Sequence, residues 1–313
     1  MLAVKAKAQL GWAISTQILV ISCWLNTAAT LPAISVEYGL GAGAASGLTA
    51  AVPGGSAIGA LGLAIRRTTD RVRPAVLISM GSVATAAFTL LPALLDLGFI
   101  WVVVSKAFVG LALAAVYTTG MRVVLSWAPP RHRSLAVTAL VAALTVGTAA
   151  PHLLARSIGG GQWRPLMILT AALALTAALA LTAALIGLTS RTGLHVSPIR
   201  HVSLADALAV VRNPVQRRIT IAYVGHMWEV YGVWVWVPSL MPSLPAITAL
   251  SGPERAAAVG GWTFVVIWVA GTIGCFVGGF LPRFSSGRLV ARAVVAVSAV
   301  CVLLTPLLDS VPF

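Results

Sequence analysis

Apolar side chains fill long runs along this chain, and short polar segments rich in arginine separate the runs. A helix that crosses the hydrocarbon core of a bilayer needs about 20 such residues, and its backbone polar groups must be satisfied within the segment. Judged by that length, the sequence predicts nine membrane-spanning helices. Their expected ranges are 10–34, 45–65, 74–95, 99–127, 134–157, 164–189, 218–241, 257–281 and 289–307.

The composition supports an all-α, polytopic membrane bundle. Hydrophobic residues make up 59% of the 313 positions and charged residues only 9%, whereas a soluble domain carries about 25% charged residues. This excludes a soluble domain and a disordered chain. Cys23, Cys275 and Cys301 all lie in apolar runs without the spacing of metal ligands. We therefore expect no metal site and no cofactor.

The charge distribution predicts how the chain lies in the membrane. The formal net charge is +14, but the basic residues lie in short clusters between the apolar runs, where the positive-inside rule explains them without a nucleic-acid partner. With a cytoplasmic N-terminus, sixteen Lys and Arg fall in cytoplasmic segments and three in outer segments. We expect a multi-pass protein of the cell membrane with its N-terminus in the cytoplasm.

The longest polar segment divides the chain. Residues 190–217 follow six predicted helices and are expected to form a cytoplasmic linker between a six-helix bundle at 1–189 and a partial bundle of about three helices at 218–313. An internal repeat agrees with this division. The run GALGLAIRRTTDRVRPAVLIS at 59–79 and the run GCFVGGFLPRFSSGRLVARAVV at 274–295 both join two apolar helices through a basic turn, six helices apart.

At these segments the chain resembles the major facilitator superfamily of secondary transporters. Asp70, Arg71 and Arg73 match the charged part of the family's signature between helices two and three, although Arg66 stands where a glycine is usual. Lys106 stands where the fourth helix usually carries an arginine. Further likenesses are LTVGTAAPHLLARSIGG in helix five, the Trp-Arg pair that opens helix six, and YVGHMWEVYGVWVWVP in helix seven.

The resemblance covers nearly the whole chain and implies a fold, a mechanism and a gate. Members of the superfamily have two halves of six helices each, so the resemblance predicts a chain truncated after nine of twelve helices. It implies transport by alternating access around a site between the halves. It also implies that the turn with Asp70, Arg71 and Arg73 gates the passage, while the alternative for the arginines is a simple topology anchor.

Ionisable and aromatic residues of helix seven are the densest candidates for chemistry. His226 and Glu229 are three residues apart and share one helix face, so the imidazole could exchange a proton with the carboxyl group and couple proton flow to transport. Tyr231 and Trp234 lie beside them, with Trp228 and Trp236. The alternative is a polar pair that bonds another helix, with the tryptophans as an interfacial belt.

Further candidates lie in helices one, four and five. Lys106 could pair with an anionic solute, or its long side chain could extend to the outer surface. For Arg122 such an extension to the cytoplasmic surface is the favoured interpretation. Trp24 and Asn26 precede Pro32 near an expected helix break and could line a cavity or mediate helix packing. His152 is expected to be a packing residue.

These observations favour a secondary active transporter of a small solute, with proton coupling as one option. The basic residues suit an anionic solute and the aromatic residues an amphiphilic cation. One alternative is a drug or metabolite exporter with ten short helices, which would place the repeat five helices apart. The other is a non-transporting scaffold or an intramembrane enzyme. We expect no enzymatic activity, because the seven acidic residues are scattered and lie mostly near helix ends.

Overall fold

The computed structural model describes residues 2–158, 162–187, 212–281 and 284–304, and all the regular structure in these ranges is helical. This confirms the predicted class, a polytopic helical bundle. Six stretches are long and apolar enough to cross a membrane, and α8 adds a shorter apolar part, Trp163–Ala178. The six stretches are Ala8–Tyr38, Ala42–Arg66, Pro74–Leu94, Phe99–Trp127, Arg133–Ile158 and Gly252–Phe280.

The helices up to residue 187 form the first bundle. A short 3₁₀ turn, Pro130–His132, precedes α7. The helices are α1 (Leu2–Ile21), α2 (Asn26–Tyr38), α3 (Ala42–Arg66), α4 (Thr68–Arg71), α5 (Pro74–Leu94), α6 (Phe99–Trp127), α7 (Arg133–Ile158) and α8 (Trp163–Gly187).

The second set of helices begins at Pro214. Asn213 caps α10, because its side-chain oxygen accepts hydrogen bonds from the backbone N–H groups of Val215 and Gln216. A 3₁₀ turn, Met241–Ser243, follows α10, and a π-helical turn, Val266–Ala270, joins α12 to α13. The helices are α10 (Pro214–Leu240), α11 (Pro245–Thr248), α12 (Gly252–Val265), α13 (Gly271–Phe280) and α14 (Gly287–Leu304).

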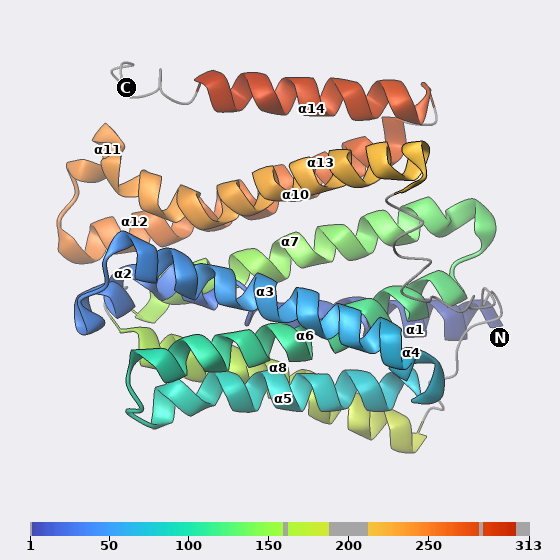
Figure 1. The fold of residues 1–313 in the computed structure, drawn as a ribbon, viewed down its shortest axis with the longest axis horizontal. Helices are drawn as coiled ribbons and strands as arrows, with labels where there is room; N and C mark the ends of the chain where they lie inside the picture. Colours follow the sequence, from blue (N-terminus) through green and yellow to red (C-terminus); the bar gives the residue numbers. More distant parts are fainter. Residues whose placement is uncertain (1, 159–161, 188–211, 282–283, 305–313) are drawn as a thin grey trace.

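Close helix crossings hold the first bundle together. A Cβ added at Gly110 of α6 would lie 2.0 Å from the carbonyl oxygen of Val52 in α3, and one added at Gly55 would lie 1.9 Å from that of Ala107. The two helices therefore approach through paired glycines, as small residues allow in membranes. Figure 1 shows α3, α5, α6 and α8 side by side, with α7 between them and α10, α13 and α14.

Several boundaries differ from the sequence prediction, and two of these differences bear on the site and on the linker. The first span is broken at residues 22–25, ahead of Asn26, and Pro32 lies inside α2, so Pro32 is not the site of the break. The helix after the predicted linker starts at Pro214, four residues before the expected boundary. The rest of that linker, 190–211, lies outside the described residues.

Candidate functional site

Lys106 is the eighth residue of α6 and lies inside the first bundle. Its side chain is 0% exposed, so the alternative in which it extends to the outer surface is wrong. The ammonium group donates a hydrogen bond of 2.8 Å to Asn26 Oδ1 and one of 3.0 Å to Met167 Sδ in α8. Three helices of the first bundle thus meet at this cation.

Asn26 occupies the first position of α2, directly after the helix break. Its amide nitrogen donates to Thr170 Oγ1 at 3.0 Å, and the Thr170 hydroxyl donates to backbone carbonyls of its own helix. These bonds direct the amide oxygen of Asn26 toward Lys106. Cys23, in the break, also donates to the carbonyl oxygen of Thr170. The break is thereby anchored to α8 by side chains.

The partners of Lys106 are neutral. Within the described ranges no carboxylate oxygen lies within 4.0 Å of its Nζ atom, since the five ion pairs found there involve other residues. A charged group at the centre of a membrane helix costs about 2.5–3.5 kcal/mol on insertion scales, and such groups usually find a partner of opposite charge. A buried ammonium group of this kind favours an anionic partner, and none of the described residues supplies one.

An aromatic group joins the helix break to α10. The rings of Trp24 and Tyr231 stack with centroids 6.0 Å apart, and Trp234 meets Tyr231 edge-on at 5.7 Å. The structure thus brings together three of the predicted site residues, from two sets of helices. Trp228 is 83% exposed and Trp236 is 57% exposed, so these two tryptophans lie at the surface of α10, away from this group.

His226 and Glu229 share one face of α10, as predicted from their spacing. His226 Nδ1 lies 3.9 Å from Glu229 Oε2. The Ser298 hydroxyl of α14 donates a short hydrogen bond to Glu229 Oε1. The carboxyl group thus connects α10 to α14, and it makes no ion pair with Lys106.

The predicted gating turn contains one firm ion pair. Arg122 of α6 donates to Asp70 Oδ1 at 2.9 Å, and Arg67 Nε lies 3.8 Å from the other oxygen. Arg122 therefore belongs with Asp70 at the basic end of the bundle and is not brought to Lys106. Arg71 and Arg73 are exposed and form no ion pair with another described residue.

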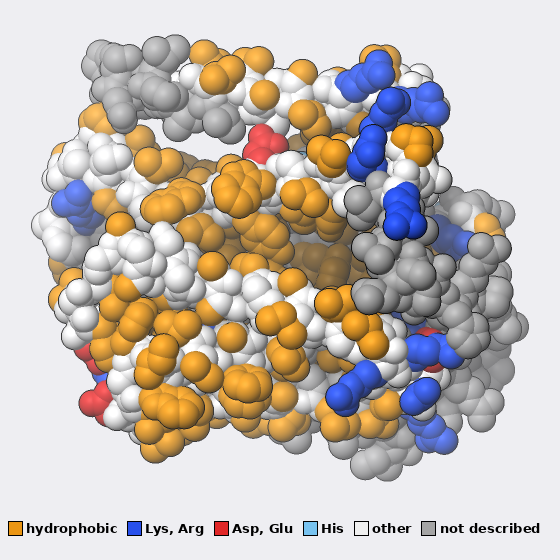
Figure 2. Space-filling view, viewed as in Figure 1, with side chains coloured by type: hydrophobic (Ala, Val, Ile, Leu, Met, Phe, Trp, Pro, Cys, Tyr) orange, Lys and Arg blue, Asp and Glu red, His pale blue; other side chains and the backbone are white. Residues whose placement is uncertain are grey.

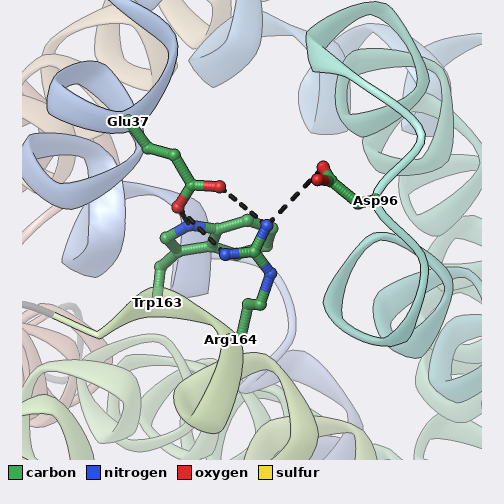
Figure 3. Close-up of polar contacts among 4 residues, drawn as sticks. All are labelled: Glu37, Asp96, Trp163 and Arg164. Carbon is green, nitrogen blue, oxygen red and sulfur yellow. Dashed lines mark hydrogen bonds and ion pairs between the residues drawn. The ribbon is translucent and has the colours of Figure 1, made fainter.

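A second charged cluster, which sequence reasoning missed, lies at the other end of the bundle (Figure 3). Arg164 at the start of α8 makes two hydrogen bonds with Glu37, at 2.7 and 3.0 Å, and lies 3.7 Å from Asp96. The Trp163 indole also donates to Glu37 at 2.6 Å. The sequence gives only a weak signal for this cluster, which consists of two acidic residues beside the ends of apolar runs and a Trp-Arg pair.

His152 of α7 is 2% exposed and lies apart from the Lys106 group. Its backbone oxygen faces α12, where a Cβ at Gly260 would lie 2.6 Å away. The imidazole Nε2 has no hydrogen-bond partner among the described residues. His152 is thus buried at the contact between the two sets of helices, and its packing role stays a prediction.

Known proteins of similar fold span more residues than this chain. A bacterial homolog to the human lysosomal transporter Spinster, in its inward-facing and unoccupied conformation, matches with a TM-score of 0.63 and 20% identity over 90% of this chain and 64% of that one. The inward-facing and occupied conformation of such a homolog matches with a TM-score of 0.59 and 21% identity, over 90% of this chain and 63% of that one. The chain thus spans less than two thirds of these relatives. No curated protein matches it.

The family match decides between the interpretations that the sequence left open. The model of the Major Facilitator Superfamily matches residues 13–313, which is nearly the whole chain. The ten-helix exporter class is thereby set aside in favour of the family to which the signature residues pointed. This multi-pass membrane protein belongs to the Major Facilitator Superfamily.

Proposed function

We propose that the protein is a secondary active transporter that moves a small organic anion across the membrane by alternating access. The observation that carries this proposal is Lys106, a fully buried cation whose partners are a neutral amide and a thioether. Its site adjoins a helix break, as the midplane sites of secondary transporters often do.

The surroundings of Lys106 favour an anion with a planar apolar part. The ammonium attracts a negative group, and it repels a cation that would bind to the nearby rings by cation-π contact. Trp24 lies two residues before Asn26 and stacks on Tyr231. In this proposal the solute enters between the two sets of helices beside these rings and reaches Lys106, which is enclosed in the arrangement described.

Proton coupling is assigned to Glu229 in this proposal. The carboxylate accepts a hydrogen bond from Ser298 and lies beside His226. Protonation of the carboxyl group would remove its charge and weaken the bond that connects α10 to α14. Proton binding would in this way shift the second set of helices between arrangements.

Asp70 and Arg122 provide the gate at the basic end. Their ion pair joins the turn between α3 and α5 to α6, so breaking it would release one end of the passage. In this proposal the basic end faces the cytoplasm, as the excess of Lys and Arg at that end indicates. Figure 2 shows most of the visible Lys and Arg side chains gathered at one end of the molecule.

Uptake into proteoliposomes tests the proposal. The probes are radiolabelled naphthalenesulfonate, a permanently charged planar anion, and ethidium, a planar cation. We expect protein-dependent uptake of naphthalenesulfonate that a proton gradient accelerates, with no such uptake of ethidium. Uptake of ethidium alone would contradict the anionic class, and uptake indifferent to the gradient would remove proton coupling. Protein-dependent uptake of neither probe would favour the scaffold alternative.

A further inference from the structure

A groove separates α7 from α13 beside their line of contact. It has a volume of about 470 Å³ and is lined mainly by Arg133, Val137 and Val141 of α7 and by Cys275, Gly278 and Gly279 of α13. One wall belongs to the first bundle and the other to the second set of helices.

The groove exists because α7 and α13 are in close contact and α13 carries small residues next to that contact. The hydroxyls of Thr145 and Thr272 are hydrogen-bonded at 3.0 Å. The two helices meet again at Thr138 and Gly279, each seven residues from this pair. A Cβ added at Gly279 would lie 2.3 Å from Thr138 Oγ1. Gly278, next to this contact, has no atom within 4 Å of its Cβ position. The absent side chain leaves the space open.

The chemistry of the lining is apolar along the groove and cationic at one end. Arg133 is the first residue of α7. Its Nε atom is buried and has no hydrogen-bond partner among the described residues, and no described carboxylate lies within 4.0 Å of the guanidinium group. A buried donor without a hydrogen-bond partner destabilises the protein, and a ligand that accepts its hydrogen bond removes this penalty.

We propose that this groove binds an anionic phospholipid. The acyl chain lies along the valines, Cys275 and Gly278, and the phosphodiester accepts hydrogen bonds from Arg133. Anionic lipids are enriched in the cytoplasmic leaflet, which is where the basic end of the protein is expected to lie. Free phosphate shares the headgroup chemistry but cannot fill an apolar groove.

A lipid bound here touches both sets of helices. Because the Thr145–Thr272 pair and the contact of Gly279 with Thr138 connect the same two helices, a lipid beside them adds a third contact. The bound lipid therefore stabilises the arrangement in which α7 and α13 are adjacent. This site is separate from the Lys106 site and does not depend on which solute the protein moves.

Native mass spectrometry of the detergent-solubilised protein tests the site. Phosphatidylglycerol and phosphatidylcholine are titrated in turn, with inorganic phosphate as a third arm. We expect the native protein to retain phosphatidylglycerol preferentially, and Arg133→Gln to weaken that retention about tenfold. Gly278→Leu fills the groove and is expected to abolish retention of either lipid at this site.

Matched variants separate the groove from general effects of charge and bulk. Arg66→Gln removes an exposed arginine at the same end of the molecule, and Gly62→Leu adds the same side chain on α3, where the Cβ position is also open. Both are expected to retain phosphatidylglycerol like the native protein. Equal retention of phosphatidylglycerol in all four variants would overturn the proposal, as would retention of inorganic phosphate equal to that of phosphatidylglycerol. If Gly278→Leu fails to fold, Arg133→Gln carries the test alone.

Discussion

Lys106 and Glu229 are ionisable groups on long helices of the two helix sets, and the protein surrounds them differently. Lys106 is 0% exposed and is held by side chains of α2 and α8, whereas 22% of the Glu229 side chain is exposed and its contacts are one serine and one histidine. A fixed, enclosed cation is suited to binding. A partly exposed carboxyl group is suited to exchanging protons.

The packing of the two sets explains this difference. Fourteen residues of α6 are buried, and none of α10 is. The neighbours of Lys106 belong to helices that interlock around it, while Tyr231 of α10 meets the first bundle by stacking on Trp24.

The largest effect is expected from crowding the tight crossing. Gly110→Leu places a side chain 2.0 Å from the backbone oxygen of Val52, which forces α3 and α6 apart and destabilises the protein by about 3 kcal/mol. Gly225→Leu on α10, where the Cβ position is open, should change stability by less than about 0.5 kcal/mol. Thermal unfolding in detergent measures both, and equal losses would contradict the contrast in packing.

The next effect concerns binding at Lys106. Lys106→Met keeps a long side chain but removes the charge, so uptake of naphthalenesulfonate should fall to background. Stability should be unchanged or higher, because the buried cation has no ionic partner in the described chain. Arg66→Met, at an exposed position, is the control and should transport normally. Retained uptake in Lys106→Met would show that the buried cation does not bind the solute.

A smaller effect is expected from neutralising Glu229. Glu229→Gln preserves an oxygen that accepts the Ser298 hydroxyl bond but can no longer take up a proton. Uptake should continue, and its acceleration by a proton gradient should disappear. Rates measured with and without the gradient give the answer. A gradient response equal to that of the native protein would place proton coupling elsewhere.

The smallest effect is expected at Ser298. Ser298→Ala removes the donor to Glu229 but leaves the carboxyl group partly exposed to other partners. A loss of stability of about 1 kcal/mol is expected, with a reduced gradient response, because the bond that protonation weakens is already absent. Thermal unfolding and uptake are measured on the same preparation. A gradient response equal to that of the native protein would mean that the connection to α14 does not carry the coupling.

The sequence was informative about helices because a membrane constrains their length and polarity strongly. It also singled out Lys106, since an ionisable residue in an apolar run stands out. The partners of Lys106 could not be predicted, because Met167 and Thr170 are ordinary residues of an apolar helix and reach the site only through the tertiary fold.

The position of the helix break also could not be predicted from the sequence. Pro32 suggested a break, yet it lies inside α2. The helix is interrupted at residues 22–25, which contain neither proline nor glycine. There the backbone N–H groups of Cys23 and Trp24 bond to carbonyls three residues back, and the side chains of Cys23 and Asn26 bond to Thr170. Contacts with another helix thus determine where the break lies.

Accessibility of a single cysteine at Tyr231 tests the central claim most directly. In a background of Cys23→Ala, Cys275→Ala and Cys301→Ala, Tyr231→Cys is labelled with a membrane-impermeant maleimide in whole cells and in inside-out vesicles. Trp228→Cys, on the outer surface of the same helix, is the control. Alternating access predicts labelling of Tyr231→Cys from both sides, with Asp70→Asn increasing labelling at one side and decreasing it at the other. Labelling from one side only, unaffected by Asp70→Asn, would contradict the account.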